Sequence, residues 1–152
     1  MRNVETVEIG FHPLTPKAAS RVPTRATEGA AGWDIQATLD EEVRLGPGER
    51  ALIPTGFAVS LPEGFEAQVR PRSGWAYREG ITLLNTPGTI DSDYRGEVKV
   101  LLINLGDKEV WIKDGDRIAQ LVISRVPPVQ FVVRNEWTET GRGSGGFGHT
   151  GR

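Results

Sequence analysis

Short segments in which apolar and polar residues alternate predict a protein built from β-strands. Residues 65–70 show the alternation most clearly, because Phe65, Ala67 and Val69 would share one face of a strand. Comparable segments predict strands at residues 4–9, 33–35, 51–53, 57–61, 97–104, 109–113, 117–124 and 129–134. Many short strands separated by turns indicate an antiparallel sandwich or barrel.

One short helix interrupts this pattern. Ser73 is expected to cap a helix over residues 75–79, and Gly80 is expected to end it. The prolines and small residues of segment 12–25 predict a loop. The 19 glycines and 10 prolines argue against any long helix.

Composition narrows the class of protein. The 152 residues suffice for one domain with a hydrophobic core, and the net charge of −2 gives no general attraction to nucleic acid or an anionic membrane. The absence of cysteine excludes disulfides, thiol nucleophiles and thiolate zinc sites. The first five residues lack the apolar core of a signal peptide, and no segment has the length of a membrane span. We therefore expect a cytoplasmic protein.

The last thirteen residues differ from the rest of the chain. They contain six glycines and no aliphatic residue, so they divide the chain into a β domain of residues 1–139 and a flexible arm of residues 140–152. A disordered end would explain this composition. A lid is the functional alternative, because Arg142 could bind a phosphate and Phe147 could stack on a planar ring.

A loop at residues 85–96 is rich in turn-forming residues and precedes the most apolar run of the chain, residues 98–103. Asp91 in this loop could orient and deprotonate a water near a phosphate, although a lone aspartate often only caps a turn. Tyr94 could face a sugar or belong to the core. This loop is the strongest candidate for a catalytic segment.

Polar residues elsewhere suggest an anion site. Arg70 and Arg72 precede the predicted helix, whose N-terminus favours anions, although the same residues would also suit a simple turn. Gln120 is a single amide among apolar residues and lies either on the wet face or near a ligand. Asp34 could support a hydrated Mg²⁺ or merely cap a loop.

Taken in order, five segments resemble the motifs of the homotrimeric dUTPase family, and the likeness runs from about residue 25 to the C-terminus. The segments are Ala31-Gly32-Trp33-Asp34, Pro71-Arg72-Ser73-Gly74, residues 85–96, residues 115–120 and residues 142–148. The resemblance implies a distorted jelly-roll subunit and a trimer with active sites at subunit interfaces. It also implies Mg²⁺-dependent hydrolysis of dUTP to dUMP and pyrophosphate, which supplies thymidylate synthesis and keeps uracil out of DNA.

The resemblance implies roles in base recognition and catalysis for the central loop. Asp91 would be the general base that activates water for attack on the α-phosphorus. Tyr94 would lie under the deoxyribose and exclude a 2′-hydroxyl. Lys99 would act through its backbone at the start of the return strand of a hairpin. The uracil and sugar pocket would be lined by Asn85, Gly88, Thr89 and Ile90.

The resemblance also implies how the phosphates and the metal are held. Asp34 would support the hydrated Mg²⁺, and Gln120 would position phosphate or water. Arg142 would meet the γ-phosphate, and Phe147 would close over uracil. Phosphates would be bound from a neighbouring subunit by Arg72, Ser73 and Gly74. Because the protein is slightly acidic, the counter-charge must be local, and the candidate arginines are Arg72, Arg117 and Arg142.

Two alternatives remain open at this point. A dCTP deaminase, or its bifunctional form, shares the fold but needs a glutamate placed for deamination, whereas the loop here offers Ile90 and Asp91. A jelly-roll module without enzymatic activity would not need Asp91, Arg142 and Phe147 together.

Overall fold

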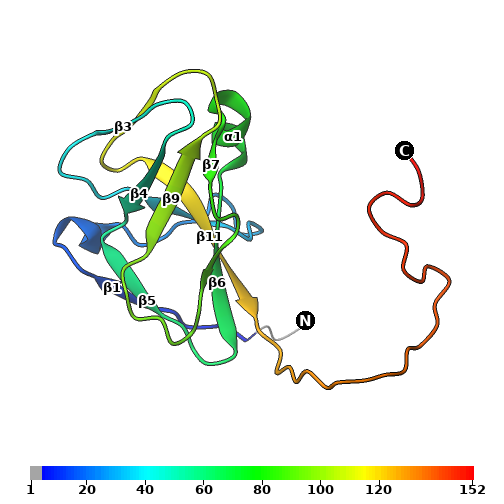
Figure 1. The fold of residues 1–152 in the computed structure, drawn as a ribbon. Helices are drawn as coiled ribbons and strands as arrows, with labels where there is room; N and C mark the ends of the chain where they lie inside the picture. Colours follow the sequence, from blue (N-terminus) through cyan, green and yellow to red (C-terminus); the bar gives the residue numbers. More distant parts are fainter. Residues whose placement is uncertain (1–4) are drawn as a thin grey trace.

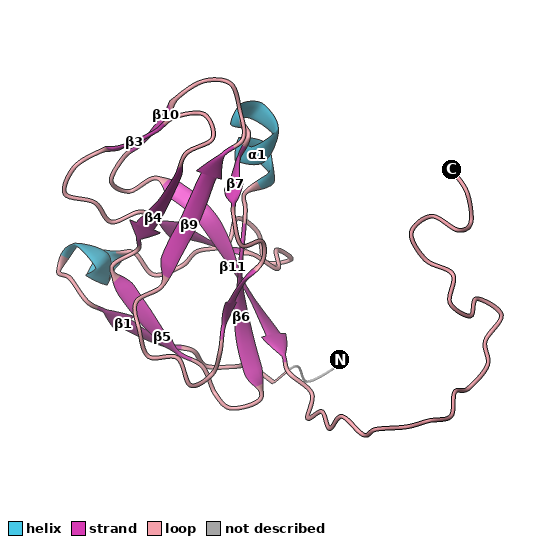
Figure 2. Cartoon of the chain, viewed as in Figure 1, coloured by secondary structure: helices cyan, strands magenta, loops and turns pink. Residues whose placement is uncertain are grey.

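The computed structural model describes residues 5–152 as small antiparallel sheets with one α-helix and one 3-10 helix (Figure 2). The helices are η1 (Lys17–Ser20) and α1 (Ser73–Glu79). The strands are β1 (Gly10–Pro13), β2 (Trp33–Gln36), β3 (Val43–Leu45), β4 (Arg50–Pro54), β5 (Phe57–Ser60), β6 (Phe65–Arg70), β7 (Ile81–Leu83), β8 (Gly88–Ile90), β9 (Lys99–Asn104), β10 (Val110–Ile112) and β11 (Arg117–Arg125). Within residues 5–152 both helices are too short to span a bilayer, since α1 has 7 residues.

Two larger sheets form the body of the molecule. One has the order β2-β11-β6-β8 and the other the order β4-β9-β7, while β1 pairs with β5 and β3 with β10. Every pair is antiparallel. This arrangement confirms the all-β class and the distorted jelly roll with one short helix.

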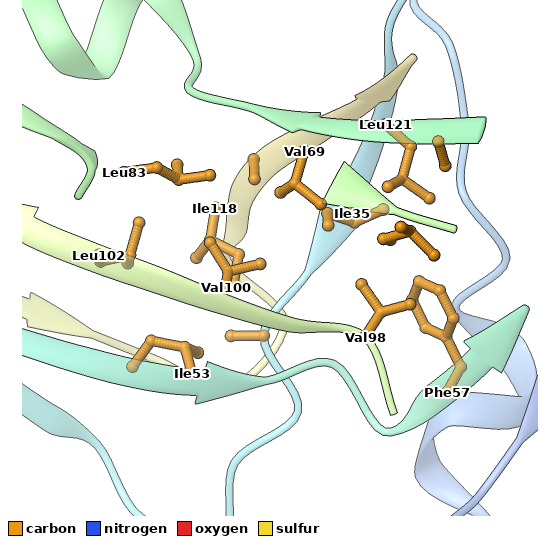
Figure 3. Packing of buried hydrophobic residues seen from close by; sticks show 14 of the residues in the cluster. Ile35, Ile53, Phe57, Val69, Leu83, Val98, Val100, Leu102, Ile118 and Leu121 are labelled. Atoms are coloured by element: carbon orange, nitrogen blue, oxygen red, sulfur yellow. The ribbon is translucent and has the colours of Figure 1, made fainter. Parts of the chain in front are cut away.

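The core lies between the two larger sheets (Figure 3). Strand β9 shows why, because Val100 and Leu102 point inward at alternate positions and are fully buried. They face Ile35 and Ile118 of the four-stranded sheet, and Phe57 closes one end. The alternating pattern of the sequence therefore places one face of each sheet in the core.

Most predicted strands and the end of the helix are confirmed. Strand β6 covers residues 65–70 as predicted, and Gly80 ends α1 with a left-handed φ of 72°. The capping prediction for Ser73 was wrong, since Ser73 is the first helical residue and Arg72 occupies the cap position without a side-chain hydrogen bond. The segment 12–25 is not all loop, because it contains the end of β1 and helix η1.

Two strand predictions were wrong. Residues 5–9 form no strand, and pairing begins at Gly10; residue 4 of that prediction lies outside the described residues. Residues 129–134 also form no strand, and Phe131 and Val133 are almost fully exposed. Their apolar pattern has no partner strand within residues 5–152, so alternation alone did not produce pairing.

The loop at residues 85–96 connects β7 and β9, which pair antiparallel, so these two strands form the predicted hairpin. Within the loop, β8 pairs with β6 of the four-stranded sheet. The loop therefore crosses from the three-stranded sheet to the four-stranded sheet and returns. This crossing brings residues of both sheets to the same place.

After β11 the chain leaves the body as a long arm without helix or strand (Figure 1). The arm lies beside the sheets without packing on them, and the hydrogen bonds of residues 140–152 join only residues within this segment. Regular structure thus ends at Arg125, while the functional division after residue 139 stays a prediction.

Candidate active site

A pocket of about 390 Å³ opens where the crossing loop meets the two sheets. Six predicted site residues line it: Asn85, Gly88, Thr89, Ile90, Tyr94 and Lys99. Its volume is in the range of small-molecule sites. The structure therefore gathers the predicted base and sugar residues around one cavity.

The apolar walls of this pocket were missing from the sequence prediction. Leu52 of β4 and Leu101 of β9 face each other across the strand pair, and Val69 of β6 forms another wall. In sequence these residues look like ordinary strand positions. Only the pairing of β4 with β9, and of β6 with β8, reveals that they border the same space as Asn85.

Position 88, which lines the pocket, leaves little room for a side chain. Gly88 lies opposite Val69 in the β6–β8 register, and a Cβ atom there would lie 3.3 Å from the Val69 Cβ and 3.5 Å from the Asn85 amide nitrogen. The first distance is tighter than an ordinary contact, so Val69 would have to shift slightly, whereas the second is an ordinary contact. Glycine avoids this shift.

Asp91 follows β8 directly and is next in sequence to Ile90, which lines this pocket, whereas Asp91 itself is not a lining residue. Its backbone carbonyl accepts a hydrogen bond from the Tyr94 amide at 3.1 Å, which closes a tight turn. Its side chain is exposed and forms no hydrogen bond or ion pair with residues 5–152. A carboxylate in this position can accept a proton from a water molecule next to a bound ligand.

A second cluster surrounds Asp34 of β2, whose side chain is buried. The Asp34 carboxylate lies 3.5 Å from Arg72 Nε and 3.6 Å from Arg117 Nη1, and the Gln120 amide donates to it at 3.3 Å. The β2–β11 register places Gln120 opposite Asp34. The cluster holds two guanidinium groups for one carboxylate, so its net charge is positive.

Glycine also makes room in this cluster. A Cβ atom at Gly32 would lie 2.6 Å from the side-chain oxygen of Gln120, so any larger residue would displace that amide from Asp34. Ser73 and Gly74 begin α1 beside Arg72, and Ser73 is exposed. A wider cavity of about 540 Å³ lies next to the cluster and is bordered by Arg72 and Arg117.

A salt-bridge network fixes the segments on both sides of the cluster. The Arg21 guanidinium donates to the two Asp114 oxygens at 2.6 and 2.9 Å, and the Leu39 amide donates to Asp114 at 2.9 Å. Hydrogen bonds from Arg21, followed by the bond from Leu39, hold the pKa of Asp114 well below its usual range. This network ties the turn before β11 to the chain that follows β2.

The predicted lid residues lie apart from both cavities. Phe147 is fully exposed, and Arg142 donates from Nε to the carbonyl of Gly145 at 2.7 Å within the arm. The two cavities have no lining residue in common. In a single chain the 390 Å³ pocket, the arginine cluster and the predicted lid residues therefore lie apart from one another.

A magnesium site needs oxygen donors that converge. Within residues 5–152 no three His, Cys, Asp or Glu side chains converge on a possible metal site. Mg²⁺ at nucleotide sites commonly keeps its waters and uses one or two carboxylates together with phosphates. Asp34 is the predicted carboxylate for such a site, but it already faces Arg72 and Arg117, and its role in holding Mg²⁺ through water stays a prediction.

The fold and these parts define an all-β protein with a pocket in the size range of small-molecule sites and a separate, positively charged cluster around Asp34. The dUTPase family model matches residues 18–151. The deoxyuridine 5'-triphosphate nucleotidohydrolase of Chlamydia pneumoniae is 57% identical over 135 residues, covering 88% of this chain and 93% of its own. The same enzyme of Bdellovibrio bacteriovorus is 56% identical over 131 residues, covering 86% of this chain and 88% of its own. The chain belongs to the dUTPase family.

Solved structures agree with this assignment. A mutant dUTPase of Staphylococcus bacteriophage 80alpha with dUpNHpp superposes with a TM-score of 0.82 at 28% identity, covering 97% of this chain and all of its own. A second match is a mutant dUTPase of phage phi11 of S. aureus, whose structure is described for the coordination of a structural Mg(II) ion. It has a TM-score of 0.76 at 25% identity, covering 87% of this chain and 99% of its own.

Proposed function

We propose that this protein hydrolyses dUTP to dUMP and pyrophosphate. The observation that carries the proposal is the convergence of six residues from the crossing loop and β9 on one pocket, with Asp91 next in sequence to the lining residue Ile90, in a chain of the dUTPase family. The product would supply dUMP for thymidylate synthesis, and removal of dUTP would keep uracil out of DNA. We place this activity in the cytoplasm.

In this proposal Asp91 is the general base. Its carboxylate takes a proton from water, the water oxygen bonds to the α-phosphorus, and the bond from that phosphorus to the bridging oxygen breaks to release pyrophosphate. Tyr94 lies under the deoxyribose and leaves no room for a 2′-hydroxyl. Backbone groups at Gly88 and Lys99 recognise uracil, because the wrong base would leave buried polar groups unpaired.

Arg72 and Arg117 supply positive charge for the phosphates, and Asp34 with Gln120 orients them. Ser73 and Gly74 add a hydroxyl and a backbone amide at the start of α1. Bound Mg²⁺ would neutralise phosphate charge, with Asp34 as its protein-side carboxylate. On the arm, Arg142 binds the γ-phosphate and Phe147 closes over uracil, which excludes water from the site.

We propose that the active form is a homotrimer with sites at its subunit interfaces. The outer face of β4 and β9 carries Leu52, Leu101 and Ile103, and Leu52 is more than half exposed although it borders the base pocket. A second copy would cover this apolar surface and bring its arginine cluster to the pocket. Light scattering of the purified protein measures the assembly directly.

A pyrophosphate-release assay with Mg²⁺ tests the reaction. Release from dUTP, with much slower release from UTP, dCTP and dTTP, is the expected result. Equal release from all four nucleotides would contradict the proposed base and sugar recognition. Ammonia released from dCTP would instead support the deaminase alternative, which the family match does not favour.

A further inference from the structure

Gly96 lies in the crossing loop, two residues after Tyr94, and the two residues are in close contact. A Cβ atom added to Gly96 would lie 2.8 Å from Cε1 of the Tyr94 ring and closer still to its Cζ and Oη. Carbon atoms do not approach one another so closely. Any residue other than glycine at position 96 would therefore move the ring.

The backbone of Gly96 does not itself require glycine. Gly48, Gly64 and Gly80 have φ angles of 78°, 87° and 72°, which disfavour other residues, but Gly96 is not among the glycines of positive φ. Alanine at position 96 would fit the backbone. The ring of Tyr94 is thus the feature that restricts this position.

The Tyr94 side chain is held at its far end as well. Its hydroxyl donates to the carbonyl of Glu97 at 2.8 Å, so the ring spans the turn directly across Gly96. Its amide donates to Asp91, which ties the ring position to the proposed catalytic residue. Tyr94 and Glu97 both line the base-sized pocket.

We propose that Gly96 is a positioning residue that sets the Tyr94 ring and, through it, the selection of deoxyribose over ribose. This inference rests on the proposed function. Tyr94 is 45% exposed, so a methyl group at position 96 can push the ring aside without disturbing the core. The expected damage is to substrate selection, while the fold is retained.

The first test observes the ring without relying on activity. The chain has only two tyrosines, and Tyr77 is 92% exposed, so protein labelled with 3-fluorotyrosine gives one reporter signal and one reference signal. Gly96→Ala is expected to shift the Tyr94 fluorine resonance and leave that of Tyr77 unchanged. The control Gly29→Ala, at an exposed glycine of ordinary φ with no atom within 4 Å of its added Cβ, should shift neither.

The second test measures selection. Gly96→Ala is expected to lower the ratio of kcat/KM for dUTP over UTP by about tenfold or more, because a small misplacement of a positioning group is costly. Gly29→Ala should keep the wild-type ratio. In a Tyr94→Ala background the ring is absent, so adding Gly96→Ala should change the ratio no further.

Two results would overturn the inference directly: an unmoved Tyr94 resonance, or an unchanged ratio of kcat/KM for dUTP over UTP in Gly96→Ala. A third would be a loss of this ratio from Gly96→Ala that is as large in the Tyr94→Ala background as in the wild type. That result would mean that Gly96 serves the loop backbone and not the ring. A wild-type protein unable to hydrolyse dUTP would overturn the proposed function together with ribose selection. The fluorine spectrum would still decide whether Gly96 sets the ring.

Discussion

Asp114→Asn is expected to destabilise the fold in a way that depends on pH. Asp114 receives two hydrogen bonds from Arg21 and one from the Leu39 amide, and Lys17 lies 3.5 Å away. Asparagine has the same shape, but its side-chain NH2 group would face the N–H groups of Arg21. Two donors cannot form a hydrogen bond with each other. The substitution therefore removes the charge and part of the hydrogen bonding while leaving the packing unchanged.

The magnitude follows from the number of bonds and from solvent exposure. Hydrogen bonds to charged groups contribute about 1.5–3 kcal/mol each when shielded from water. The Asp114 side chain is 36% exposed, so water can replace part of what is lost. We expect the free energy of unfolding to fall by about 2 kcal/mol at pH 7.

The sign of the pH dependence follows from the lowered pKa of Asp114 in the folded state. An unfolded aspartate has a pKa of about 3.9, so the stabilisation is complete above that pH. It is lost as the pH falls toward the lower pKa of the folded protein. The difference between wild type and Asp114→Asn should therefore be largest at neutral pH and shrink at about pH 3.

Urea unfolding followed by the fluorescence of the four tryptophans measures this difference at both pH values. The protomer concentration must be the same throughout, because assembly contributes to apparent stability. Asp107→Asn is the matched control, since Asp107 is exposed and has no ion pair or side-chain hydrogen bond within residues 5–152. Equal stability of wild type and Asp114→Asn, or a difference as large at pH 3 as at pH 7, would refute the reasoning.

Three further predictions concern the site and the core. Asp91→Asn should lower the rate of pyrophosphate release by about 100-fold or more. The urea midpoint should not change, because the Asp91 side chain is exposed. An unchanged rate would show that Asp91 is not the general base. Deleting residues 140–152 should abolish most activity yet leave the melting temperature unchanged, because the hydrogen bonds of this segment are internal; full activity would show that the arm is no lid. Leu102→Ala should cost about 2–5 kcal/mol in urea unfolding because Leu102 is fully buried, and a loss below about 1 kcal/mol would contradict its place in the core.

Sequence reasoning succeeded where the information is local. The alternation of residues 65–70 defined β6, Gly80 marked the end of α1, and the residues that line the 390 Å³ pocket include six from the predicted list. Most of those six lie within one loop, so the sequence already groups them. The pairing of Asp34 with Arg72 and Arg117 comes from three distant segments, and only the order of the family motifs connected them.

Sequence reasoning failed where an outcome depends on distant partners. Residues 129–134 have a strand pattern, but a strand also needs an edge to pair with, and these residues pair with none within the described part. Leu52 and Leu101 look like core residues, yet they border the 390 Å³ pocket because β4 pairs with β9. The hairpin of β7 and β9 was predicted, but the pairing of β8 with the distant strand β6 inside its loop was not.

The arm after β11 can be regarded as a tethered ligand. Its 27 residues, 126–152, would have a root-mean-square span of about 30 Å as a flexible coil. Phe147 would thus be held near the sites of its own assembly at an effective concentration of about millimolar. Closure would then be insensitive to dilution of the enzyme. Lengthening the arm with inert residues should weaken closure although every contact in the closed site is preserved.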